Sequence, residues 1–233
     1  MGEGMKSNAK LDDWVPKTEV GKMVKSGQIN SIEEIFRIGK KILEPEIVDY
    51  LLPNLEAETL EIRTTQRMTD CGRKTQYRAV VIVGDKNGHV GIGMAKSEEA
   101  KPAIENATKK AKLNIIYVPR GNGSWEDTYK SPHSIPIKTK GKEGSVEVVL
   151  KPAPRGIGIA ANQIVRKVLT YAGVKNVWSF ARGRTRNILN MAKACIKALD
   201  ALNKLKYRGD WSEMGSRGEE IANLKAELKV QKA

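Results

Sequence analysis

The sequence predicts an α+β protein of two domains, and three observations carry this prediction. Residues 57–94 alternate between apolar and polar side chains, which is typical of strands, and an amphipathic helix follows them. Glycine, proline and serine then crowd residues 121–134, which indicates a linker. A second group of strands and helices occupies residues 135–205. We therefore expect a three-stranded sheet with one helix, followed by an α/β sandwich.

Residues 1–56 are expected to form an arm and short docking helices. Residues 1–16 are polar and show no periodicity, which predicts a flexible arm. Ser31 and Glu34 form a capping box at one helix start, and Pro45 suits the first turn of another helix. This block is net acidic, and the sequence leaves open whether it docks on the same chain or on a neighbouring one.

The first domain, residues 57–120, is expected to begin with a hairpin. Apolar and polar residues alternate over 60–68, and a polar loop at 69–74 leads into a second strand over 77–83. The sequence Asp-Lys-Asn-Gly at 85–88 predicts a type I′ turn, which requires positive φ at both central residues.

The third strand carries glycine at every second position. Gly91 and Gly93 share one face, where a helix or an RNA backbone could approach closely. The helix that follows is expected to begin at Pro102, because proline suits a first helical turn. Its buried stripe is predicted to consist of Ala103, Ile104, Ala107, Ala111 and Ile115.

The second domain, residues 135–205, is expected to be an α/β unit. Its predicted elements are strands at 135–140 and 145–151 joined by a Gly-Lys-Glu-Gly turn, a Pro/Gly loop, a helix stopped by Gly173, a strand at 174–180, a basic loop at 181–186 and a last helix. A charged tail, residues 206–233, ends the chain.

The composition indicates a polyanion as partner. The chain has 233 residues, with 41 Lys plus Arg against 27 Asp plus Glu and a formal charge of +14. The positive excess lies in residues 61–205, whereas residues 1–60 are net negative. A basic surface that only keeps the protein soluble would not require the positive charge to be concentrated in one part of the chain. Charge alone leaves such a merely soluble basic protein open as the alternative.

Other features narrow the class of protein. The only two cysteines, Cys71 and Cys195, are far apart, which fits a reducing cytosol. The sequence shows no apolar run long enough to cross a bilayer and no signal-peptide core, so we expect a cytoplasmic protein that does not bind membranes. Its two histidines, His89 and His133, lack metal-ligand spacing, and no metal, cofactor or catalytic residue is predicted.

Clusters of arginine indicate phosphate contacts. Arg182, Arg184 and Arg186 alternate with small residues just before a helix start, where guanidinium groups and free backbone N–H groups would converge on one spot. The alternative is a solvated loop. Aromatic residues make up 5% of the chain, which favours recognition of RNA shape over stacking on bases. Trp125 and Tyr129 in the linker could stack on a base or pin the linker to a domain.

One motif points to an enzyme instead. Residues 154–161, with glycine at 156 and 158, resemble the phosphate loop of small-metabolite kinases such as galactokinase. Those kinases carry serines where this chain has Ala160 and Ala161, and no obvious catalytic carboxylate follows. A metabolite kinase therefore stays open as a weak alternative, and a free double-stranded RNA-binding regulator stays open as another.

Several motifs together resemble small ribosomal subunit protein five. They are the glycine-rich run at 72–93, PAPRGIGI at 152–159 and AGVKNVWSFARG at 172–183. SPHSIP at 131–136 is similar to the archaeal and eukaryotic form of that family. The resemblance implies a first domain related to the double-stranded RNA-binding fold and a second domain of the type found in protein five, a fold that the metabolite kinases share.

The same resemblance implies function and partners. The expected protein is a structural constituent of the small ribosomal subunit that binds rRNA, contacts protein four and other subunit proteins, lies near the path by which mRNA enters, and supports translational accuracy. Charge pattern and resemblance together give these expected rRNA-binding residues: Arg67, Arg73, Lys74, Arg78, Lys96, Lys151, Arg155, Arg182, Arg184 and Arg186. The turn at 182–186 replaces a bacterial Gly-Ser-rich turn, so its three arginines are assigned from charge and geometry and not from the resemblance. The expected protein-four residues, Gly158 and Arg166, match positions of the family. At Asp70-Cys71-Gly72 the bacterial pattern differs, so bacterial antibiotic effects are not carried over to this loop.

Overall fold

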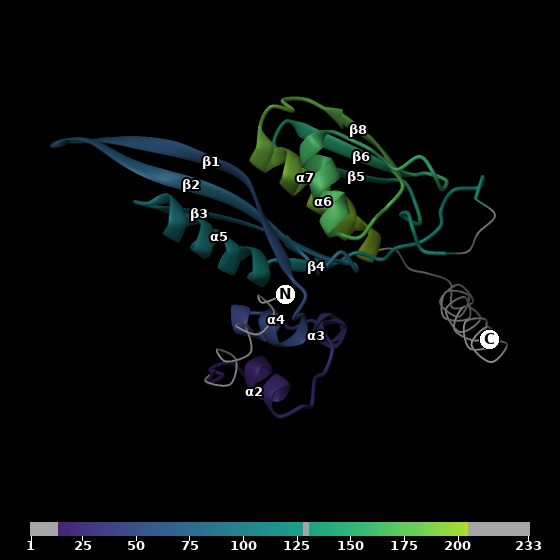
Figure 1. Ribbon diagram of the computed structural model, residues 1–233, viewed down its shortest axis with the longest axis horizontal. Coiled ribbons are helices and arrows are strands. Elements are labelled where there is room, and N and C mark those ends of the chain that lie inside the picture. Colours follow the sequence, from purple (N-terminus) through teal and green to yellow (C-terminus); the bar gives the residue numbers. More distant parts are fainter. Residues whose placement is uncertain (1–13, 128–130, 205–233) are drawn as a thin grey trace, which may run out of the picture.

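A computed structural model describes residues 14–127 and 131–204 and confirms an α+β fold with two sheets (Figure 1). The helices are α2 (Glu19–Lys25), α3 (Ile32–Ile38), α4 (Pro45–Leu51), α5 (Ala100–Leu113), α6 (Gln163–Tyr171) and α7 (Ile188–Asn203). The first sheet consists of β1 (Glu56–Thr69), β2 (Gly72–Gly84), β3 (His89–Ser97) and β4 (Ile115–Tyr117). The second has the order β5 (Thr139–Glu143), β6 (Val146–Pro152), β8 (Val177–Arg182), β7 (Ile159–Ala160). Most of the predicted arm and all of the predicted tail lie outside the described residues.

Helix α5 packs directly on the glycine face of β3. A Cβ atom on Gly91 would lie 2.3 Å from the carbonyl oxygen of Ala111, and one on Gly93 would lie 2.0 Å from that of Ala107. Real Cβ atoms do not approach backbone so closely, so only glycine permits this packing. The close approach that the glycines predict is therefore made by the helix, which leaves no room for RNA on this face.

The helix and the sheet differ from the prediction in two details. The helix begins at Ala100, with Glu99 as its N-cap, so Pro102 lies inside the first turn and does not open it. Ile115 is buried but belongs to β4, a fourth strand that pairs with β3. The expected three-stranded sheet therefore has four strands, because the chain turns straight back from the helix into a short edge strand.

The turn between β2 and β3 is a hairpin, but it is not the predicted type I′ turn. Positive φ occurs at Lys86 (59°) and Gly88 (107°), whereas Asn87 does not adopt it. Asp85 shapes the turn instead. Its carboxylate accepts hydrogen bonds from Asn87 N (2.7 Å), from His89 N (3.0 Å) and from the His89 ring Nδ1 (2.6 Å). Burial alone would raise the pKa of Asp85, but these hydrogen bonds outweigh it and hold the pKa below its usual value.

Replacing Asp85 with asparagine is expected to remove part of the acid sensitivity of folding. A carboxyl group whose pKa is lowered by folding stabilises the protein above its unfolded pKa, near 4, and that stability is lost as the pH falls through the folded pKa. Urea unfolding between pH 7 and pH 3 should show a shallower loss of stability in Asp85→Asn, together with a lower stability at pH 7. Equal pH dependence in the variant and the wild type would contradict this assignment.

The first and the last predicted strands of the second sheet are both shifted toward the C-terminus. Its first strand begins at Thr139, not at 135, and it includes Gly141, which the sequence placed in a turn. Gly141 lies in the strand because α7 packs on it: a Cβ atom there would be 2.1 Å from Ala194 O. The last strand begins at Val177, not at 174, and continues through Arg182, so the basic loop is shorter than expected.

The N-terminal block docks on its own chain. Buried residues of α3 and α4, including Ile35 and Ile47, form one apolar cluster with Ile115 of the first domain. Lys112 of α5 forms an ion pair of 2.6 Å with Asp49 of α4. Ser31 is the N-cap of α3 as predicted, but its side chain makes no capping bond. Glu34 accepts a hydrogen bond from Asn30 N (3.3 Å), one residue before the cap, so the predicted capping box is not formed.

The two sheets share one hydrophobic core. Ile82, Val90 and Ile92 of the first sheet cluster with buried residues of α6, α7 and the second sheet. The contact is close, since a Cβ atom on Gly84 would lie 2.5 Å from Tyr171 O and one on Gly173 would lie 2.1 Å from Lys86 O. An ion pair between Lys167 and Glu58 (2.6 Å) lies at the same junction. The two domains are therefore held as a single body.

Candidate RNA interface

The β1–β2 hairpin projects beyond the rest of the molecule (Figure 1). Strand β3 accompanies β2 only as far as the pair Tyr77–Ser97, and five further β1–β2 pairs continue to Thr69–Gly72. Only Asp70 and Cys71 form the turn, so most of the predicted loop at 69–74 is strand. A two-stranded ribbon has little core of its own, and a position against a binding partner would stabilise it.

Cations gather at the end of this ribbon. Arg67 lies directly opposite Lys74, and Met68 lies opposite Arg73. All four side chains are exposed. Like charges directly opposite each other destabilise an isolated hairpin, whereas a polyanion between them removes the repulsion. The tip is therefore suited to phosphate groups.

Arg78 and Lys96 lie further back along the same ribbon and are neighbours on β2 and β3. Arg78 is half-buried, and its guanidinium lies 3.6 Å from the Glu61 carboxylate, which also pairs with Arg63. Lys96 is exposed. Lys96 is therefore open to an external phosphate, whereas Arg78 already has an internal partner.

Two other predicted cations project from the second sheet on the side away from α6 and α7, which we call the open face. Lys151 lies on β6 opposite Trp178, and Arg182 lies on β8 opposite Glu147. A hydrogen bond from Lys140, with a smaller contribution from Arg182, lowers the pKa of Glu147. The carboxylate is thus held ionised beside an excess of positive side chains.

The predicted arginine cluster is divided between strand and turn. Arg182 belongs to β8, and Arg184 and Arg186 are exposed in the tight turn that follows. Gly183 has φ of 89° and approaches Ser145 so closely that a side chain would not fit. The backbone N–H groups at the start of α7 were expected to be free for phosphate. One of them, that of Asn190, instead donates to the Asn187 side chain at 3.4 Å.

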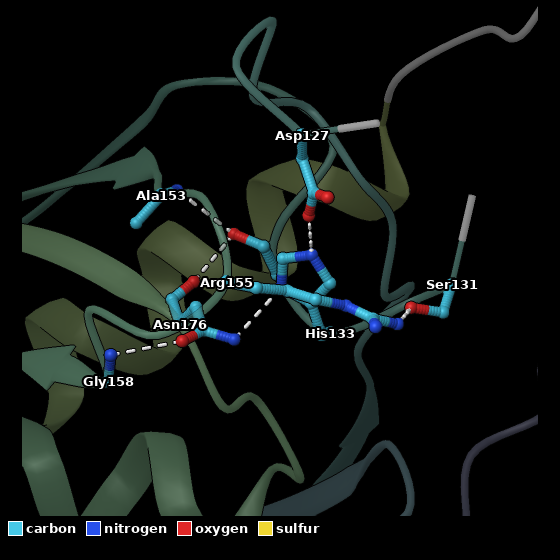
Figure 2. Close-up of polar contacts among 8 residues, drawn as sticks. Asp127, Ser131, His133, Ala153, Arg155, Gly158 and Asn176 are labelled. Atoms are coloured by element: carbon cyan, nitrogen blue, oxygen red, sulfur yellow. Dashed lines mark hydrogen bonds and ion pairs between the residues drawn. The ribbon is translucent and has the colours of Figure 1, made fainter. Parts of the chain in front are cut away.

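Arg155 and Gly158 lie on the Pro/Gly loop beside a buried polar network (Figure 2). Gly158 N donates to Asn176 Oδ1 (3.0 Å), and Asn176 Nδ2 lies 3.0 Å from His133 Nδ1. The His133 ring reaches Asp127 through Nε2, and Arg155 contacts the hydroxyl of Ser131. This network ties the linker to the Pro/Gly loop.

The donor and acceptor roles in this network follow from its geometry. A backbone N–H group can only donate, so Asn176 must present Oδ1 to Gly158 and Nδ2 to His133. His133 Nδ1 is then the acceptor, and the ring hydrogen lies on Nε2, which donates to Asp127. Ser134 extends the network, since its hydroxyl donates to Asn176 O (2.6 Å) and accepts from Ala153 N (3.2 Å).

The structure thus places the predicted residues in three groups. Those of the first domain lie along the hairpin, Lys151 and Arg182 share the open face with Arg184 and Arg186 at its end, and Arg155, Gly158 and Arg166 lie on the Pro/Gly loop and the exposed side of α6. Sequence reasoning missed Lys138 and Lys140 on the open face, with Trp178 and Phe180. The sequence does contain a signal for them, because large or charged side chains stand at every second position over 138–142 and 178–182. Trp125 does not pin the linker, because it is 90% exposed, and Tyr129 lies outside the described residues.

Within the described residues, no three His, Cys, Asp or Glu side chains are grouped as metal ligands require, and no helix is long and apolar enough to cross a membrane. Burial raises the pKa of the Cys195 thiol to about 12, so this cysteine stays protonated and packs as part of the core.

The fold and charge distribution define a basic two-domain protein with a projecting cationic hairpin. Comparison with known proteins identifies its family. "Ribosomal protein S5, N-terminal domain" matches residues 55–119, and "Ribosomal protein S5, C-terminal domain" matches residues 141–211. The small ribosomal subunit protein uS5 of Aeropyrum pernix is 50% identical over 203 residues, covering 87% of this chain and 93% of that protein. The uS5 protein of Methanoregula boonei is 50% identical over 194 residues, covering 83% of this chain and 95% of that protein.

The chain belongs to the ribosomal protein uS5 family of the small subunit, in its archaeal type. The uS5 protein of Methanococcoides burtonii, 52% identical over 188 residues, supports the same assignment. Family membership locates the protein at the ribosome in the cytoplasm.

Proposed function

We propose that this protein is a non-catalytic clamp that binds rRNA within the small ribosomal subunit. The observation that carries the proposal is the shared core, which holds the hairpin cations and the open-face cations in fixed relation. Two separate cationic surfaces on one rigid body can fix two RNA segments relative to each other without any bond-making chemistry.

The hairpin would contribute Arg67, Arg73, Lys74 and Lys96, with Arg78 as a support at its base. The second surface would contribute Lys151, Arg182, Arg184 and Arg186, and Arg155 would bind phosphate beside the linker. Family membership supports this assignment, since every relative named above is a small-subunit ribosomal protein.

Three finer parts of the proposal concern partners. Gly158 of the Pro/Gly loop and the exposed Arg166 of α6 would contact protein four. The hairpin would lie near the path by which mRNA enters. The stability of the protein-four contact would then bias closure of the subunit and so influence decoding accuracy. Crosslinking in intact subunits, mapped to nucleotides and to protein four, tests all three, and crosslinks from these residues to neither would overturn them.

Replacing Arg182, Arg184 and Arg186 together by alanine is expected to weaken binding to small-subunit rRNA about tenfold at moderate salt. The slope of log affinity against log salt should fall by about three, because each lost phosphate contact removes about one released counterion. Filter binding over a series of salt concentrations measures both quantities.

A matched control removes the same charge from the net acidic block. Lys17, Lys22 and Lys41 are exposed and lie away from both cationic surfaces. Their triple alanine variant should keep a slope within about one of wild type. If the arginine variant kept the wild-type slope, Arg182, Arg184 and Arg186 would not be phosphate contacts.

The two alternative functions make different predictions. A metabolite kinase would bind ATP saturably and turn over a substrate. A free RNA-binding regulator would bind isolated duplexes tightly and would not co-sediment with ribosomal subunits. Co-sedimentation without turnover supports the clamp, and either of the other results contradicts it.

A further inference from the structure

The open face carries two aromatic side chains to which the proposed function gives no role. Trp178 and Phe180 are two residues apart on β8, a central strand of the second sheet. Alternate residues of a strand point to the same side, so both rings project from this face. Their exposed fractions are 39% and 54%, although burial in a core is the usual place for rings of this size.

Cations surround both rings. Strand pairing places Lys151 opposite Trp178, and it places Val149 between Phe180 on one side and Lys140 on the other. The Arg182 guanidinium lies 5.1 Å from the centre of the Phe180 ring. These side chains line a hollow of about 600 Å³ together with Lys138 and Glu147.

The charge in this hollow is positive. Its lining holds four cations, Lys138, Lys140, Lys151 and Arg182, and a single carboxylate, Glu147. Glu147 is already neutralised by Lys140 at 2.7 Å. The remaining positive charge is complementary to an anionic partner, and the exposed rings are complementary to a partner with flat apolar faces.

We propose that the open face binds unpaired RNA nucleotides, whose bases stack on Trp178 and Phe180 while their phosphates contact the surrounding lysines and Arg182. The two rings are roughly 7 Å apart along the strand, a distance that one extended nucleotide spans. A four-stranded sheet with stacking aromatics on its open face is a general solution for binding two or three unpaired bases. This inference rests on the proposed function and specifies which kind of RNA this surface takes.

A duplex and a protein fit this face less well. The bases of a duplex are stacked on each other, so their flat faces are not available to the rings. A protein partner would have to bury several lysines, and lysine is depleted in the cores of protein interfaces. Backbone phosphates, in contrast, neutralise lysines at the same time as the bases stack.

The test uses the full chain and three RNA probes, namely short oligoadenylate, short oligouridylate and a blunt RNA duplex. Replacing Trp178 by alanine is expected to weaken binding of the two single strands about tenfold or more, the effect of one lost base stack. Duplex affinity should change by less than about twofold. Trp178→Tyr, which keeps a stacking ring, should recover most of the lost affinity.

Two controls separate stacking from charge and from general exposure. Trp125 is more exposed than Trp178 but lies in the linker, so Trp125→Ala should leave single-strand affinity unchanged. Lys151→Ala should lower the salt slope by about one, whereas Trp178→Ala should leave the slope at its wild-type value. Quenching of tryptophan fluorescence by oligoadenylate should be reduced in Trp178→Ala alone.

Three results would overturn the inference. Single-strand affinity could be unchanged in both Trp178→Ala and Phe180→Ala while the wild type still binds rRNA and joins subunits, in which case the proposed function stands and only the stacking site fails. The aromatic variants could bind oligonucleotides normally but fail to join subunits, which would make the open face a protein contact. The wild type could bind neither rRNA nor subunits, in which case the proposed function fails as well.

Discussion

Replacing Gly93 with valine is expected to prevent the first domain from folding. The first side-chain carbon would lie 2.0 Å from Ala107 O and 2.4 Å from Ala111 N. Both atoms belong to the backbone of α5, so no side-chain rotation relieves the clash. The helix would have to move off the sheet and expose the fully buried contacts of Ala107 and Ala111. We expect a loss of about 4 kcal/mol or more in the free energy of unfolding, measured by urea denaturation.

Lys96→Val provides the control on the same strand. Lys96 is exposed, so a β-branched residue there should change stability by less than about 0.5 kcal/mol. A Gly93→Val protein that unfolds at the wild-type urea concentration would show that α5 does not press on β3. A destabilised Gly93→Ala would support the same contact with a smaller clash.

The sheet of the first domain could be predicted because its pattern is local. Alternation identifies the strands, and glycine at 91 and 93 identifies the face where α5 packs. The short strand β4 could not be predicted. Three residues are too few to show alternation, and Ile115 follows Ala111 at the spacing of a helix, so it looked like a continuation of α5. The contact between Gly84 and Tyr171 was also beyond prediction, because it joins residues that are distant in sequence.

Much of the candidate site was predictable from its basic residues, but Lys138 and Lys140 and the two rings of the open face were missed. The composition of the turn after β8 identifies Arg184 and Arg186. Lys140 escaped notice because the strand was expected to end there, and its alternation with buried residues was therefore cut short. Trp178 and Phe180 were treated as ordinary strand residues. Only the folded structure shows that the opposite side of the sheet packs on α6 and α7, which leaves the side of these rings open.

Replacing Asn176 with leucine is expected to release the Pro/Gly loop from the linker. Leucine has nearly the same shape but no polar atoms, so the buried His133 Nδ1 and the partly buried Gly158 N would both lose their partners. Each unsatisfied buried group costs about 1–3 kcal/mol, so the expected loss in the free energy of unfolding is about 2–5 kcal/mol. Urea denaturation measures the loss, and hydrogen exchange should show the Gly158 amide losing its protection.

Two further variants test whether the network causes this effect. Lys175 is the exposed neighbour of Asn176, so Lys175→Leu should leave both the stability and the protection of Gly158 unchanged. Asn176→Asp retains an oxygen that can accept the Gly158 N–H, so protection of that amide should persist even where overall stability falls. Because Gly158 belongs to the proposed contact with protein four, Asn176→Leu should also weaken that contact while hairpin crosslinks to RNA remain. Full Gly158 protection in Asn176→Leu would show that other contacts hold the loop in place.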